Sequence, residues 1–253
     1  MQGLLKQLPQ HKPWMVAIGA IAVVVVVAVC SFGSFMLVKD DNEVVGAAPT
    51  PETTVVKRDI TTRQTDPNPM TVADVFPNAE IIADPSYPPY KIMGAAQASD
   101  DCRVAGDGDV RKLLQTIGCS QVVRATFSVP DGKYFVTGGI FNLPDATVAS
   151  QFATDVRGLI ADKKGRFTGY ISDPAQNVVL GRAPLTHAFE VRGHFLVYIV
   201  VVKVDGSEFE PDDPGVKLIQ YDVMQKYLRD KVLVDWSIEK TPPSASAAVS
   251  PSP

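Results

Sequence analysis

The chain has 253 residues, of which 45% are hydrophobic and 21% charged, and its formal net charge is −4 at pH 7. All 28 acidic residues and 22 of the 24 basic ones follow residue 38, so this part carries a formal charge of 22 minus 28, or −6. Proteins that bind nucleic acid or anionic lipid head groups present clustered Lys and Arg, so the composition argues against both classes of partner.

The first predicted element is an uncharged run of 25 residues from Trp14 to Val38. A helix of that length rises about 37 Å and can cross a hydrocarbon core of about 30 Å with some tilt. The sequence therefore predicts a transmembrane helix at residues 13–38, placed in the lipid bilayer.

The charges on either side of this run predict its orientation. Lys6 and Lys12 precede it without any acidic residue, whereas residues 39–43 carry three carboxylates and one lysine. Positively charged flanks stay in the cytoplasm. We therefore expect residues 1–12 to form a cytoplasmic tail and the rest of this single-pass signal-anchor protein to lie outside the plasma membrane.

Two alternatives fit this segment less well. A cleaved signal peptide has an apolar core of about 7 to 15 residues, which is shorter than this run. Lipid attachment at Cys30 needs a small residue directly before the cysteine, and Val29 occupies that position. Cys30 is therefore expected to be a buried membrane thiol.

Composition then divides the rest of the chain into three parts. Residues 39–71 are rich in Pro and Thr and have few apolar residues to offset ordering, which predicts a flexible linker. Residues 239–253 are a low-complexity Pro/Ser/Ala tail, expected to be disordered. Residues 72–238 are long enough to bury one sizeable core and are expected to form the extracytoplasmic domain.

A disulfide and a helix are predicted at the start of this domain. Outside the membrane Cys102 and Cys119 are expected to pair, and the absence of C-x-x-C spacing argues against a redox dithiol. Asp107 or Asp109 can cap a helix between them, and Gly118 can end it. Its apolar residues recur at i, i+3, i+4 and i+7: Val110, Leu113, Leu114 and Ile117.

Two hairpins follow. Residues 123–129 alternate as a half-buried strand, and residues 133–139 return after a Pro-Asp-Gly turn, with Gly138-Gly139 suggesting a bulge or a close backbone approach. Residues 183–191 and 195–204 form the second hairpin around Arg192-Gly193. The arm from Phe195 is apolar on both faces, which is typical of a central strand.

Two more helices are predicted. One begins at Pro144-Asp145 and the other at Asp213-Pro214, each with an apolar stripe. The only dense basic patch, Lys163, Lys164 and Arg166, is interpreted as a helix C-terminus. The element order predicts an α+β domain in which helices pack on one face of an antiparallel sheet, with a loosely ferredoxin-like order.

No motif for catalysis, phosphate or cofactor binding is present, so no cofactor is expected. His187 and His194 could suggest a metal site. If the hairpin turns at Arg192-Gly193, they lie roughly 13 Å apart, so we interpret them as ordinary strand histidines.

Two segments remain as weaker candidates. An acidic loop could bind a cation, although it lacks the D-x-D-x-D-G spacing: Asp205, Glu208, Glu210 and Asp212. Tyr87 and Tyr90, in a proline-rich segment, could contact a partner as an extended strand, or the segment could be a linker laid on the domain surface.

Residues 119–127, 131–134 and 142–145, together with the anchor and linker, resemble uncharacterised single-pass membrane proteins of high-GC Gram-positive bacteria. The resemblance implies no activity. We expect a non-catalytic accessory, scaffold or sensor domain that binds an envelope protein or cell-wall component. The alternative is an envelope hydrolase with an unrecognised active site. An enzyme should show a pocket with converging titratable groups, and a binding module an exposed apolar patch or sheet edge.

Overall fold

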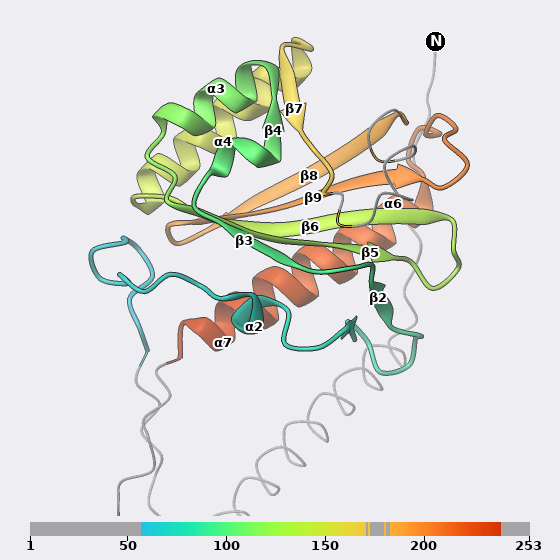
Figure 1. Ribbon diagram of the computed structural model, residues 1–253, viewed down its shortest axis with the longest axis horizontal. Helices are drawn as coiled ribbons and strands as arrows, with labels where there is room; N and C mark the ends of the chain where they lie inside the picture. Colours follow the sequence, from blue (N-terminus) through green and yellow to red (C-terminus); the bar gives the residue numbers. More distant parts are fainter. Residues whose placement is uncertain (1–56, 171, 173–179, 181–182, 239–253) are drawn as a thin grey trace, which may run out of the picture. The chain divides into compact units, whose positions relative to one another are not determined.

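The computed structural model describes residues 57–170, 172, 180 and 183–238 (Figure 1). The predicted transmembrane helix at 13–38, the start of the linker and the tail at 239–253 lie outside these residues. Within the described ranges no helix combines the length and the apolar character that crossing a bilayer requires.

The domain is built on a seven-stranded antiparallel sheet. Two hairpins, β5–β6 and β8–β9, lie side by side because β6 pairs with β9. The four strands, in sheet order, are β5 (Gln121–Ser128), β6 (Tyr134–Asn142), β9 (Phe195–Lys203) and β8 (Leu185–Arg192). The strand predicted to be central, β9, is central.

The two edges of the sheet differ. Short strands complete the sheet beyond β5, where β2 and β3 pair with successive parts of β5 and β1 pairs with β2. They are β1 (Glu80–Ile81), β2 (Tyr90–Ile92) and β3 (Gln97–Ser99). At the opposite edge lies β8, the longest edge strand. Two further short strands, β4 (Gly106–Asp107) and β7 (Gly165–Phe167), pair separately.

Helices cover both faces of the sheet. One face packs against the C-terminal helix and α2: α2 (Val72–Val75), α6 (Pro214–Ile219), η3 (Gln220–Val232) and α7 (Leu233–Trp236). The other face packs against the elements seen on the opposite side in Figure 1: η1 (Cys102–Ala105), α3 (Gly108–Thr116) and α4 (Ala146–Ala161).

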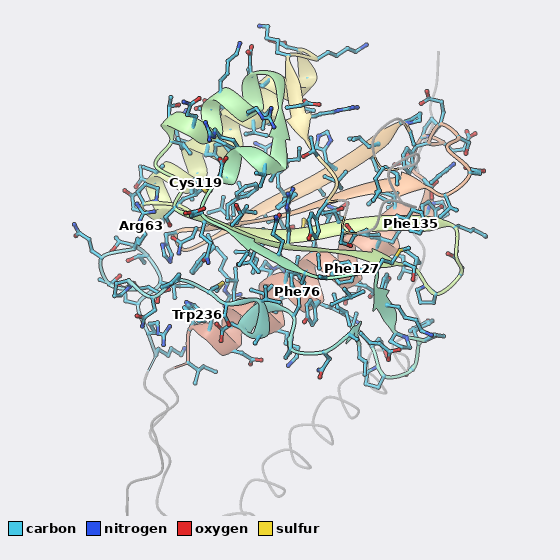
Figure 2. The ribbon with its side chains drawn as sticks, viewed as in Figure 1. Arg63, Phe76, Cys119, Phe127, Phe135 and Trp236 are labelled. Carbon is cyan, nitrogen blue, oxygen red and sulfur yellow. A yellow bond between two sulfur atoms is a disulfide. The ribbon has the colours of Figure 1, made fainter. Side chains whose placement is uncertain are left out.

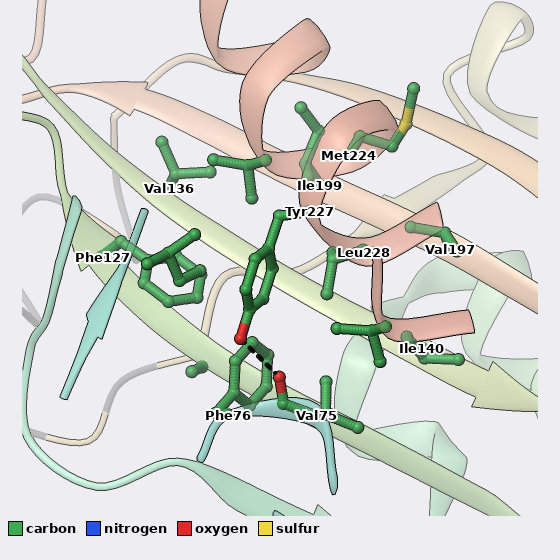
Figure 3. Close-up of a cluster of buried hydrophobic side chains, with 14 of the residues drawn as sticks. Val75, Phe76, Phe127, Val136, Ile140, Val197, Ile199, Met224, Tyr227 and Leu228 are labelled. Atoms are coloured by element: carbon green, nitrogen blue, oxygen red, sulfur yellow. Dashed lines mark hydrogen bonds between the residues drawn. The ribbon is translucent and has the colours of Figure 1, made fainter. Parts of the chain in front are cut away.

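The prediction of an α+β domain with an antiparallel sheet and helices is confirmed, but the expectation that helices cover one face only is wrong. The physical reason lies in β9, where every residue from Phe195 to Val202 is buried. Such a strand needs an apolar layer on each side. Figure 3 shows the layer beneath the C-terminal helix, where the hydroxyl of Tyr227 donates a hydrogen bond to the Val75 carbonyl at 2.7 Å.

The second layer also changes the character of β5. This strand was expected to be half-buried, yet Arg124 and Thr126 on its polar face are as buried as its apolar residues. Arg124 donates to Gln97 at 3.0 Å and to the Val104 carbonyl at 3.0 Å, and its guanidinium lies over the Tyr170 ring. These two polar residues of β5 therefore pack inward with hydrogen-bond partners, Thr126 through the Thr137 hydroxyl.

The predicted linker boundary at residue 71 is also wrong. Lys57 pairs with Ile238, and Asp66 and Met70 are buried in the domain. Arg63, labelled in Figure 2, donates a hydrogen bond to the Gly118 carbonyl at 3.1 Å. Residues 57–71 belong to the folded domain because side chains and backbone groups of the domain form hydrogen bonds with the polar groups of this segment. Composition does not reveal these contacts.

The predicted disulfide is present, with Cys102 and Cys119 separated by 6.2 Å between Cα atoms at either end of the α3 region. It indicates a folded domain outside the cytoplasm. Gly118 ends the helix region with φ +78°, as expected. Asp107 occupies the N-cap position, but its carboxylate accepts from the backbone N–H and Nε of Arg166 instead of capping α3.

The C-terminal helix differs from the α-helix that its sequence predicts, because Gln220–Val232 is π-helical. Its i→i+5 hydrogen bonds give a wider turn than an α-helix. The buried apolar residues follow the wider period: Ile219, Val223, Met224, Tyr227, Leu228, Val232 and Leu233. The segment therefore turns a nearly continuous apolar stripe towards the sheet.

Candidate binding site

The structure gives the residues of the acidic loop separate local roles. Asp205 accepts a hydrogen bond from the Ser207 backbone N–H, and Asp212 pairs with Lys217 at 3.0 Å. Among the described residues, no group of three or more His, Cys, Asp or Glu side chains is placed to hold a metal ion. The loop with Glu208 and Glu210 is therefore not developed further as a cation site.

The two tyrosines of the proline-rich segment have different environments. Tyr90 is buried in β2 and donates a hydrogen bond to Asp222 at 2.9 Å. Burial, followed by the Asp222 carboxylate, raises the pKa of Tyr90 well above its usual range. Tyr87 is 64% exposed. Of the pair, only Tyr87 offers its ring to a partner.

The two histidines lie in different parts of the second hairpin. The turn consists of Gly193 and His194, so His194 is not a strand residue as predicted. Its ring is fully buried, 3.1 Å from the Leu143 carbonyl and 3.3 Å from the Asp66 carboxylate. His187 lies seven residues earlier on β8.

The outer edge of β8 is the clearest binding feature of the domain. The residues that flank a two-residue hairpin turn form a hydrogen-bonded pair, which here is Arg192 and Phe195. Along an antiparallel ladder, hydrogen-bonded pairs alternate with non-hydrogen-bonded pairs. The backbone groups at 185, 187, 189 and 191 therefore point away from β9. No backbone group elsewhere in the described ranges bonds to them.

Helix α4 runs beside this edge and leaves two hollows along it. The first, of about 640 Å³, lies between the end of α4, β7 and the start of β8. The second, of about 410 Å³, lies between the middle of α4 and the end of β8. We call their combined lining the α4–β8 groove; its β8 residues are Leu185, His187, Phe189, Glu190 and Val191.

The charged side chains of the α4–β8 groove are mainly basic. Five Lys or Arg side chains face two carboxylates, a formal charge of +3: Arg157, Lys163, Lys164, Arg166 and Arg229 against Asp107 and Glu190. Arg166 pairs with Asp107 at 3.1 Å and Arg229 with Glu190 at 2.6 Å, while Lys164 pairs with nearby Asp162 at 2.8 Å. Arg157 and Lys163 have no carboxylate partner among the described residues.

His187 lines the first hollow of the groove. Its ring stacks on Phe189 with centroids 6.3 Å apart, and its Nδ1 is buried without a hydrogen-bond partner in the described part of the chain. Burial, followed by the charge of Arg166, lowers the pKa of His187. The neutral imidazole is therefore the resting form at pH 7.

Both sides of β8 are held by the rest of the domain. Phe189 packs edge-on against Phe167 at 5.6 Å and lies under the Arg157 guanidinium at 5.4 Å. On the other face Glu190 accepts from Gln225 at 3.0 Å and from Arg229. These contacts fix the strand, so a partner would meet a preformed edge.

The sequence located the parts of this groove but not their combination. The basic patch at 163–166 was visible and was interpreted only as a helix C-terminus. Its position beside residues 185–191 depends on sheet order, which places β8 and not β5 at the open edge. Alternation in residues 183–191 was the available signal for an edge strand.

Comparison with known proteins gives no relative from which to transfer a role: no family model, curated protein or solved structure matches this chain.

Proposed function

We propose that the protein is a membrane-anchored, extracytoplasmic binding domain that docks an envelope protein along β8. The observation that carries the proposal is an eight-residue edge strand whose outer backbone groups meet no partner within the described ranges. Such an edge can accept a further strand through main-chain hydrogen bonds. Backbone pairing favours a polypeptide partner over a cell-wall polymer.

The proposed location rests on two features. The uncharged run at residues 13–38 would anchor the chain with residues 1–12 in the cytoplasm. The disulfide between Cys102 and Cys119 fits an oxidising exterior. The protein would thus act as an accessory or scaffold that presents its domain to partners outside the plasma membrane.

A binding role accounts for the groove better than hydrolysis does. The larger hollow of the groove is lined by His187 with Lys and Arg side chains, and no nucleophile or carboxylate pair converges there among the described lining residues. General acid–base chemistry needs positioned groups within hydrogen-bond reach of each other. The groove instead combines apolar side chains, cations and backbone groups, which suit a peptide.

Site-specific crosslinking in intact cells tests the docking. A photoreactive residue at Thr186 on β8 should give an adduct of one discrete mass, whereas the same residue at the exposed Lys112 on α3 should not. His187→Pro removes an outward N–H that the β9 ladder does not use, so it should abolish the adduct. His187→Ala retains that N–H and should retain the adduct. Equal adducts in both variants would contradict strand addition.

A further inference from the structure

We infer that the segment added to β8 is acidic, with its carboxylates on the side that faces α4. This inference rests on the proposed strand addition and specifies the chemistry of the partner. The α4–β8 groove has a formal charge of +3 on a chain whose residues after 38 sum to −6. A basic groove on an otherwise acidic surface favours partners of the opposite, negative charge.

Two cations of the groove are available to a ligand. Arg157 lies over the Phe189 ring in the lining of the second hollow, and Lys163 follows the end of α4 and lines the first hollow. Neither pairs with a carboxylate in the described part of the chain. Side chains of an added strand that face α4 would occur at alternate positions. Acidic residues at those positions would pair with Arg157 and Lys163.

The same charges argue against a second copy of this chain as the occupant. Two antiparallel β8 strands would extend the sheet about a twofold axis perpendicular to it, which keeps both α4 helices on one face. Arg157 and Lys163 of each copy would then face a neighbouring basic groove. Cations beside an edge strand are a common protection against self-pairing, and here they leave the edge open to an acidic strand.

His187 provides an independent reporter. A carboxylate placed over the first hollow would stabilise the imidazolium and oppose the effect of Arg166. Binding of an acidic strand should therefore raise the pKa of His187, whereas a neutral strand should not raise it.

The experiment uses the full chain in phosphatidylcholine nanodiscs and three capped eight-residue peptides: (Val-Glu)₄, (Val-Gln)₄ and (Val-Lys)₄. We expect (Val-Glu)₄ to bind at least tenfold more tightly than (Val-Gln)₄ and to slow amide exchange in β8. We expect (Val-Lys)₄ to bind least. The advantage of (Val-Glu)₄ should shrink as salt is raised from about 0.05 to 0.5 M.

Charge reversal supplies the matched control. Arg157→Glu/Lys163→Glu should transfer the preference to (Val-Lys)₄, whereas Lys112→Glu/Lys217→Glu makes the same charge change outside the groove and should leave the preference unchanged. If all three peptides slow β8 exchange equally, the acidic preference is wrong while strand addition stands. If (Val-Glu)₄ leaves β8 exchange unchanged, the inference fails, and crosslinking at Thr186 decides separately whether β8 is used at all.

Discussion

Trp236 at the end of the C-terminal helix donates its indole N–H to the buried carboxylate of Asp66 at 2.6 Å. Figure 2 shows Trp236 beside the N-terminal segment of the domain. Asp66 is 1% exposed and also accepts from Arg58 at 3.2 Å. This carboxylate therefore joins the start of the described chain to its last helix.

Replacing Asp66 with Ala should lower the free energy of unfolding by about 3 kcal/mol, because it leaves the half-buried indole N–H of Trp236 and the guanidinium of Arg58 without their buried acceptor. Chemical denaturation followed by tryptophan fluorescence measures the change. Asp235→Ala, which removes an exposed pair with Lys231 on the same helix, is the control and should leave the midpoint nearly unchanged. Equal shifts of the denaturation midpoint in the two variants would show that the buried hydrogen bonds of Asp66 do not stabilise the domain more than an exposed ion pair does.

Stability should fall as the pH is lowered below about 6.5, the ordinary histidine pKa. Burial lowers the pKa of both His187 and His194 in the folded state, so the unfolded chain binds protons first. The stability that the two neutral imidazoles contribute is therefore complete above the histidine pKa of the unfolded chain. It is lost as the pH falls towards their lower pKa in the folded state.

Melting temperatures of the parent and of His187→Gln/His194→Gln between pH 5 and 8 measure this effect. The double variant should show a flatter profile in the acidic range than the parent. Parallel profiles would contradict the assignment of the pH dependence to these two rings.

Gly139 and Gly158 should respond oppositely to alanine. A Cβ at Gly139 would lie 2.6 Å from the Val123 carbonyl oxygen and 2.8 Å from Tyr198, so Gly139→Ala should destabilise the domain by about 1–3 kcal/mol. Nothing lies within 4 Å of a Cβ at Gly158 in α4, where alanine should stabilise by about 0.5–1 kcal/mol. Denaturation midpoints that shift in the same direction would contradict this contrast.

Removal of the disulfide by Cys102→Ser/Cys119→Ser should lower stability by about 3 kcal/mol, the loop-entropy value for a sequence separation of 17. The loss of stability should be accompanied by faster amide exchange in α3, because the disulfide flanks this helix. Exchange in the central strands β6 and β9 should change less. Unchanged stability in the double serine variant would show that packing alone holds this region.

The sequence predicted features that depend on local pattern and missed those that depend on sheet order. The period of Val110 and Leu114 predicted α3. Alternation and a Pro-Asp-Gly turn predicted the first hairpin, and the glycine pair at 138–139 suggested a close backbone approach there. The two-sided packing could not be inferred from β5, because Arg124 and Thr126 look like solvent-facing residues. Only their contacts with Gln97, Thr137 and Tyr170 explain their burial.

In the α4–β8 groove, too, the local elements could be predicted from the sequence and their arrangement could not. Its cations at 163–166 and its strand at 185–191 were each recognisable, but their adjacency depends on the position of β8 at the sheet edge. The burial of Asp66 could not be predicted either, because its partners Trp236 and His194 are distant in the sequence. Composition alone assigned that segment to a linker.

Residue-resolved amide exchange of β8 by NMR tests the central claim most directly. In the free chain we predict an alternating pattern, with fast exchange at Leu185, His187, Phe189 and Val191 and slow exchange at Thr186, Ala188 and Glu190, whose N–H groups face β9. Addition of (Val-Glu)₄ should slow the four fast amides and leave the others unchanged. Four amides that remain fast with saturating (Val-Glu)₄ would overturn the acidic partner. Slow exchange at all seven positions in the free chain would show that the edge is not open and would contradict strand addition at β8.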